Sequence, residues 1–115
     1  MRFVFLSVLF MTLLVGTQVR SEDMPPSPMP AFTLTLKDHV FTPPQLTVPA
    51  NEKIKLTVRN LDPTPAEFES DDFQAEKVVP ANEEVSLTIA PLKPGTYGFF
   101  DDFHEDETKG TLVAQ

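Results

Sequence analysis

The stretch Gly95-Thr-Tyr-Gly-Phe-Phe-Asp-Asp-Phe-His-Glu-Asp-Glu-Thr-Lys-Gly-Thr-Leu-Val113 indicates how the C-terminal part of the chain folds. Apolar segments at 96–100 and 111–113 enclose a loop, a pattern that predicts two strands. The loop holds five carboxylates and one histidine within residues 101–107. Carboxylates this close together repel one another unless a cation or water screens them. The loop is therefore interpreted as half of a metal site.

Short segments in which apolar and polar residues alternate precede this stretch, with turn residues between them. In the segment 53–59, Ile54, Leu56 and Val58 are expected to face inward, and 83–89 alternates in the same way. Further strands are predicted at 32–36, 45–48, 66–69 and 74–79. A series of seven to eight short strands predicts an all-β fold, a Greek-key β-sandwich or barrel.

The N-terminus has the pattern of a secretory signal peptide over residues 1–21. Arg2 precedes an apolar run at 3–15 that is short for a membrane span, and small and polar residues follow. Cleavage is expected before Glu22, with an uncleaved anchor as the alternative. Residues 22–31 form a Pro-rich linker, and residues 32–115 form one domain. The expected location is the periplasm, with no membrane span in the mature form.

Composition excludes several classes of function. Without residues 1–21, seven of the nine basic residues and all 17 acidic residues remain, a formal charge of −10. Such a surface does not favour nucleic acid or an anionic membrane. The 115 residues include no Cys, so disulfides and thiolate-bound zinc, iron–sulfur and blue-copper sites are excluded.

Two parts of the chain together make up a further pattern. Phe41, Leu46 and Val48 precede a Pro-Ala-Asn-Glu turn and an alternating strand, and 94–100 reads Pro-Gly-Thr-Tyr-Gly-Phe-Phe. This pattern resembles the cupredoxin superfamily, in which such a strand leads to a copper-binding Cys and then to a His three residues later. The resemblance implies a cupredoxin-like sandwich.

The same resemblance assigns positions in this chain. Asp101 stands at the Cys position, His104 at the His position and Gly110 at the Gly before the last strand. The first His of the family falls at or next to Glu67, and the axial Met has no counterpart. The resemblance therefore implies the fold without a blue-copper centre.

A closer resemblance is to cupredoxin-like periplasmic proteins encoded with bacterial iron permeases. It rests on the segments 37–43, 64–70, 91–95 and 103–106. It implies that the protein binds or oxidises ferrous iron outside the inner membrane, with copper as a second candidate metal. It also implies an inner-membrane iron permease and associated periplasmic proteins as partners.

A metal site follows from the residues and the resemblance together. Glu67 and Glu69 are two apart on a predicted strand and share a face. Folding is expected to bring the loop at 66–72 and the loop at 101–107 to the same end of the sandwich. The predicted ligands are Glu67, Glu69, Asp101, His104, Glu105 and Asp106. Oxygen donors with one imidazole suit iron, Cu(II), Mn(II) or Zn(II) better than Cu(I).

Simpler interpretations of these residues stay open. The carboxylates can form a solvated surface, and Glu67 and Glu69 can be the wet face of an edge strand. His104 can bond to a neighbouring carboxylate, and His39 is interpreted as a turn residue.

Three functions remain. The first is metal binding in support of iron uptake. The second is a metal-free acidic module that docks a permease or another basic partner. The third is an enzyme with ferroxidase turnover. No motif for hydrolytic chemistry is present.

Overall fold

The computed structural model describes Gly16 and residues 28–115. The predicted signal peptide, apart from Gly16, and most of the predicted linker lie outside the described residues. Among the residues that are described, no helix is long and apolar enough to cross a membrane.

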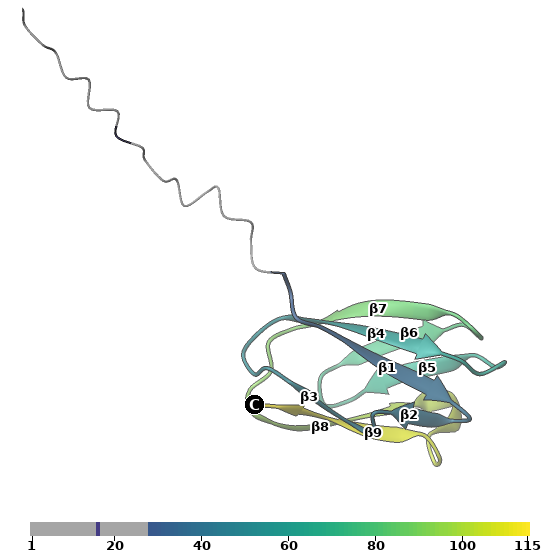
Figure 1. Ribbon diagram of the computed structural model, residues 1–115. Helices are drawn as coiled ribbons and strands as arrows, with labels where there is room; N and C mark the ends of the chain where they lie inside the picture. Colours follow the sequence, from purple (N-terminus) through teal and green to yellow (C-terminus); the bar gives the residue numbers. More distant parts are fainter. Residues whose placement is uncertain (1–15, 17–27) are drawn as a thin grey trace, which may run out of the picture.

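Two β-sheets make up the domain (Figure 1). The first sheet has the strand order β2-β1-β4-β7, and the second has the order β3-β9-β8-β5-β6. In chain order the nine strands of the described region are β1 (Ala31–Lys37), β2 (Val40–Thr42), β3 (Gln45–Val48), β4 (Ile54–Asn60), β5 (Ala66–Ser70), β6 (Ala75–Val79), β7 (Glu84–Ile89), β8 (Gly95–Asp101) and β9 (Lys109–Ala114).

The predicted all-β sandwich is confirmed, with two differences in detail. The segment 40–48 forms two short strands, because Pro43 and Pro44 separate β2 from β3. The sheets are mixed, since β1 pairs with β4 and β3 pairs with β9 in parallel. The remaining pairs are antiparallel.

The apolar side chains whose alternation predicted the strands fill the space between the two sheets. Ile54, Leu56 and Val58 of β4 are each at most 1% exposed, and Leu34 and Leu36 of β1 lie beside them in the core. Burial of such side chains contributes about 1.5–3 kcal/mol each, which replaces the disulfides that the chain cannot form.

Three aromatic rings lie where the core meets one end of the sandwich. Phe41 of β2 and Phe99 of β8 pack edge to face with ring centroids 5.1 Å apart. Phe68 of β5 lies 5.4 Å from Phe99 and 6.3 Å from Phe41. The rings tie β2, β5 and β8 together, so residues next to them in sequence are brought close in space.

Gly110 is required for this aromatic packing. A Cβ atom at residue 110 would lie 2.5 Å from two ring carbons of Phe99 and 3.1 Å from the Pro44 carbonyl oxygen. Glycine therefore lets β9 approach the Phe99 ring at the point where the acidic loop returns to the sheet.

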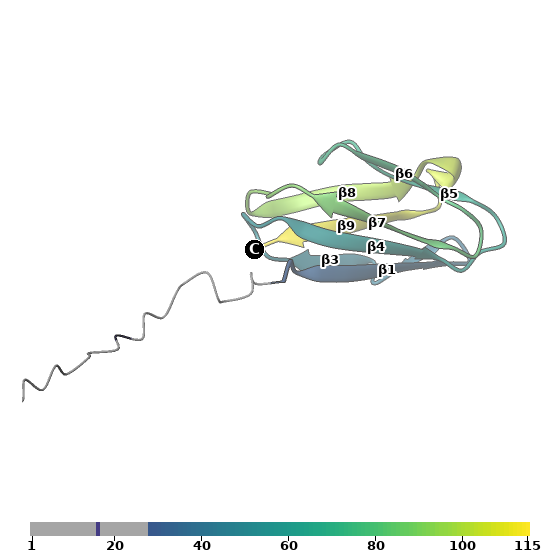
Figure 2. The same cartoon turned by 90° about the horizontal axis from the view of Figure 1, so that it is seen from above.

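The β1–β2 turn, the loop after β4 and the loop after β8 meet at one end of the sandwich. The Leu61 amide donates to the Leu36 carbonyl, and the Asp38 amide donates to the Asp62 carboxylate, 2.6 Å away. The loop after β8 begins with a 3₁₀ turn, η2 (Asp102–His104), at the far end from the C-terminus (Figure 2). We call this end the loop end.

Candidate metal centre

Asp101 is the last residue of β8, and its carboxylate is 1% exposed. Oδ1 accepts hydrogen bonds from the Glu67 amide at 2.9 Å and from the Phe103 amide at 3.0 Å. Oδ2 lies 2.9 Å from Nδ1 of His104. The carboxylate therefore caps the 3₁₀ turn and joins β5 to β8, while it also orients the His104 ring.

His39 reaches the same place from the other sheet. It lies in the two-residue turn between β1 and β2, with a φ of +61°. Its amide donates to Oδ2 of buried Asp62 at 3.1 Å. Its ring centroid lies 4.1 Å from that of His104. His39, Asp101 and His104 each offer one donor atom within 4.8 Å of the others, and we call them the histidine group.

Thr108 is hydrogen-bonded to all three members of the histidine group. Its hydroxyl donates to the His39 carbonyl at 2.7 Å, and its amide donates to the His104 carbonyl at 3.0 Å. Its own carbonyl accepts from the Asp101 amide at 3.0 Å. A single residue, 1% exposed, thus fixes the backbone positions of the group.

A second group consists of oxygen donors alone. Glu67 and Glu69 of β5 and Asp102 of η2 each offer one carboxylate oxygen within 4.8 Å of the others, and we call them the carboxylate group. Asp102 is exposed, and the two glutamates are half-buried.

Neighbouring carboxylates shift the pKa values of both glutamates in the carboxylate group. A hydrogen bond with the Glu76 carboxyl, partial burial and repulsion by Glu76, Asp102 and Glu69 together raise the pKa of Glu67 from 4.5 to about 7. Partial burial, followed by repulsion from Asp102 and Glu76, also raises the pKa of Glu69. A cation bound between these carboxylates would relieve the same repulsion.

The two groups lie on opposite faces of one sheet. Phe68 is buried between Glu67 and Glu69, so the two glutamates point away from the core. Asp101 pairs directly with Phe68, which puts its side chain on the inner face, and Asp102 follows on the outer face. The hydrogen bond from the Glu67 amide to Asp101 joins the groups through the sheet.

The six predicted ligands are therefore divided by the structure. Glu67 and Glu69 belong to the carboxylate group, and Asp101 and His104 belong to the histidine group. Glu105 and Asp106 are exposed and belong to neither group, although the charge of Glu105 contributes to raising the pKa of Glu69. The expected meeting of the loops at 66–72 and 101–107 is present, but as two sets of donors instead of one.

Two members of these groups were not among the predicted ligands. Asp102 follows the predicted ligand Asp101, and its place beside Glu67 and Glu69 depends on the pairing of β5 with β8, which the local sequence does not specify. His39 is the turn residue that the sequence predicted, and its backbone contacts fit that role. No local signal in the sequence shows that this turn lies against His104.

The donors do not fit a blue-copper centre. Asp101 takes the position expected for the Cys, and the chain has no thiolate to offer. The available atoms are carboxylate oxygens and imidazole nitrogens, which favour hard and borderline cations.

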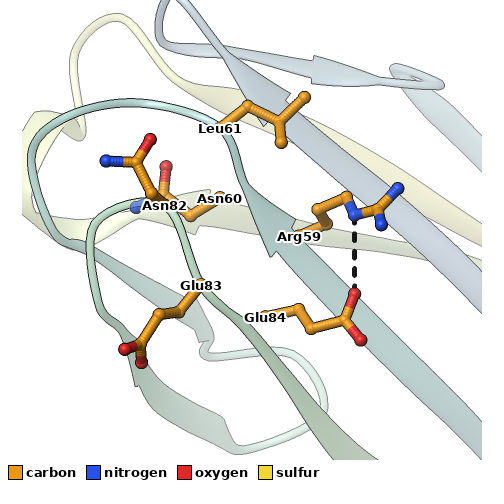
Figure 3. Close-up of a pocket in the computed structure, with 6 residues that line it drawn as sticks. All are labelled: Arg59, Asn60, Leu61, Asn82, Glu83 and Glu84. Carbon is orange, nitrogen blue, oxygen red and sulfur yellow. Dashed lines mark ion pairs between the residues drawn. The ribbon is translucent and has the colours of Figure 1, made fainter.

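A separate hollow of about 460 Å³ lies at the loop end, beside the first residues of β7 (Figure 3). Arg59 and Glu84 flank it, with Nε and Oε2 3.5 Å apart and both side chains 58% exposed. Asn60, buried at its base, donates its amide to the backbone oxygens of Thr64 and Val79. None of the lining residues belongs to the histidine or carboxylate group, and these contacts close the loops after β4 and β6.

Comparisons with known proteins agree with this architecture. A family model described as a cupredoxin-like domain matches residues 4–114. An uncharacterized protein of Rickettsia prowazekii (strain Madrid E) is 45% identical over 81 residues, 70% of this chain and 65% of that protein. The matched region therefore spans less than two thirds of that relative.

Solved structures share the fold at low identity. Auracyanin B superimposes with a TM-score of 0.65 at 18% identity, covering 80% of this chain and 93% of that one. The metal-binding domain of the Streptococcus pneumoniae Cu(I)-exporting P-type ATPase gives 0.62 at 15% identity, covering 74% and 84%.

Proposed function

Because the chain belongs to the cupredoxin-like domain family, we propose that it is a periplasmic protein that binds iron or copper in support of iron uptake. The proposal keeps the cupredoxin framework and replaces the sulfur-bound copper with a cation held by oxygen and nitrogen donors. An inner-membrane iron permease and its associated periplasmic proteins are the proposed partners.

The observation that carries the proposal is the carboxylate group. Glu67, Glu69 and Asp102 come from segments more than 30 residues apart and are held together by the amide of Glu67 on Asp101. The pKa of Glu67 is raised first by its hydrogen bond with Glu76, and the pKa of Glu69 first by partial burial, and repulsion from Asp102 adds to both shifts. A bound cation removes this repulsion, which supports the carboxylate group as the place where iron binds.

Oxygen ligands also bear on the redox state of iron. Hard anionic donors stabilise Fe(III) relative to Fe(II), so a ferrous ion in the carboxylate group is easier to oxidise. Oxidation on the protein would require an external oxidant such as dioxygen. Oxygen consumption by the protein with Fe(II) distinguishes ferroxidase turnover from carriage of the ion.

The test compares two variants that each remove one negative charge. Glu69→Gln removes one carboxylate from the group, and Asp106→Asn removes an exposed carboxylate outside it. We expect Glu69→Gln to weaken iron binding by about tenfold or more, with Asp106→Asn close to the wild type. Equal effects of the two variants would show that iron responds only to the net charge of the surface.

The second candidate function is a metal-free docking module. It is favoured by a hollow of about 330 Å³ that Asp71, Asp72 and Glu105 help to line. Phe103, in the same loop as Glu105, adds an apolar side chain that is 47% exposed. Such a surface suits a basic partner. Binding of the partner to protein stripped of metal, unchanged by added iron, would favour this function over metal carriage.

A further inference from the structure

We propose that the histidine group is a second metal site, separate from the carboxylate group and selective for a borderline divalent cation of the Cu(II) or Zn(II) class. Its ligands are the imidazoles of His39 and His104, with Asp101 beside them. This inference rests on the metal binding of the proposed function and names the residues that would hold copper, apart from the carboxylate group proposed for iron.

The turn holds His39 in a backbone conformation that is rare for a residue with a side chain. Its φ of +61° is uncommon for a residue with a side chain and persists where the surroundings determine it. The Asp62 carboxylate accepts from its amide, and the Thr108 hydroxyl donates to its carbonyl. The backbone of His39 is thus fixed from two other segments, with its ring facing His104 at 4.1 Å.

The Asp101 carboxylate orients the His104 ring. Its Nδ1 lies 2.9 Å from Oδ2 of Asp101, and Oδ1 of Asp101 already accepts from two backbone amides. A histidine that binds a metal ion through one ring nitrogen usually donates its other ring N–H to a carboxylate or carbonyl oxygen, the arrangement that Asp101 and His104 would form. Asp101 therefore acts as the carboxylate that positions the His104 ring, leaving Nε2 as the donor.

Both imidazole rings are accessible to ions from solvent. The side chains of His39 and His104 are 38% and 30% exposed, whereas Asp101 is 1% exposed. An ion can reach the two rings from solvent, and the remaining coordination positions are open to water. Two imidazole donors suit Cu(II) and Zn(II), whereas three carboxylates suit harder ions.

The sheet separates the histidine group from the carboxylate group. Asp101 lies on the inner face of the sheet with Phe68, and the carboxylate group lies on the outer face. No donor atom is shared between the groups. Each site can therefore be removed by substitution without removing a ligand from the other.

The experiment titrates the purified, metal-free protein with Cu(II) and records pulsed electron paramagnetic resonance for the nitrogens of bound imidazoles. The wild type is expected to bind one Cu(II) with signals from two imidazoles. His39→Asn keeps a residue type that tolerates positive φ and removes the ring. It is expected to lose one imidazole signal and about tenfold or more in affinity.

Two controls keep the test specific. Asp106→Asn removes a charge from the same loop outside both groups and is expected to bind Cu(II) like the wild type. Circular dichroism of His39→Asn checks that the fold is retained, and His104→Gln provides a second ring deletion that leaves the β1–β2 turn untouched. Binding of copper with no imidazole signal, or an unchanged signal in both ring deletions, would overturn the proposal.

Iron and copper are measured separately so that the two proposals can fail separately. Loss of iron binding in Glu69→Gln with an intact copper signal supports two sites. A copper signal in protein that takes up no iron overturns the assignment of iron to the carboxylate group and leaves the histidine site standing. Loss of copper binding in Glu69→Gln equal to that in His39→Asn would show one merged site and overturn the inference.

Discussion

Thr108 donates a 2.7 Å hydrogen bond from its hydroxyl to the carbonyl oxygen of His39, which lies 69 residues earlier in the chain. The bond crosses from the loop before β9 to the turn between β1 and β2. It is therefore a direct link between the two sheets at the loop end, and it fixes the position of a candidate metal ligand.

The first prediction concerns this bond. Thr108→Val keeps the shape of the buried side chain but leaves the His39 carbonyl without its donor, and we expect a loss of about 1–3 kcal/mol in the free energy of unfolding. Urea denaturation measures this change. Thr47→Val, at an exposed position of β3, is the matched control and should change stability by less than about 0.5 kcal/mol. Equal stabilities of the two variants would mean that the hydroxyl bond contributes little.

The second prediction concerns the packing of β9 on β8. Gly110→Ala places a Cβ atom 2.5 Å from the Phe99 ring, so the ring or the strand must move. We expect a loss of about 1–3 kcal/mol in the free energy of unfolding, in the range found for overpacked cores. Gly95→Ala is the control, since its Cβ would lie 3.7 Å from the nearest atom. Thermal unfolding of the pair measures the difference.

The third prediction concerns pH. The pKa of Glu67 is raised from 4.5 to about 7, so between these values the folded protein binds more protons than the unfolded chain. Stability should therefore fall as pH rises from about 4.5 to about 7. Glu67→Gln should reduce this fall and be more stable than the wild type above pH 7. The urea midpoint across this range measures the effect, with Glu52→Gln in the turn before β4 as control.

The same protonation predicts how metal binding responds to pH. A proton on Glu67 competes with a cation for the same oxygens, so iron affinity should increase as pH rises through about 7. Calorimetric titration in two buffers of different ionisation enthalpy would also detect the released proton. Affinity that is independent of pH over this range would place the ion away from Glu67.

The fourth prediction separates the two adjacent aspartates. Asp101→Ala leaves the amides of Glu67 and Phe103 without their acceptor in a buried place, and we expect a loss of about 1–3 kcal/mol or more in the free energy of unfolding. Asp102→Ala removes one of the charges that repel Glu67 and should leave stability unchanged or raised. Urea denaturation of both variants without metal tests this contrast. The reverse order of stabilities would contradict the assignment of faces.

Local alternation explains why most of the fold could be predicted. The pattern in Ile54, Leu56 and Val58 determines which face of β4 is buried, and β3 begins and ends where its sequence indicated. The division of the site could not be predicted, because it depends on the pairing of Phe68 with Asp101 across two distant strands. The place of His39 depends on how the two sheets stack, which no segment of sequence encodes by itself.

The measurement that tests the central claim most directly is equilibrium dialysis of the metal-free protein against micromolar Fe(II), without oxygen, and against micromolar Cu(II), followed by metal analysis. The account predicts that bound iron is lost when Glu67 and Glu69 are both changed to Gln, and that bound copper is lost when His39 and His104 are replaced. Protein that takes up neither metal would contradict the claim that the loop end of this sandwich binds a cation without sulfur.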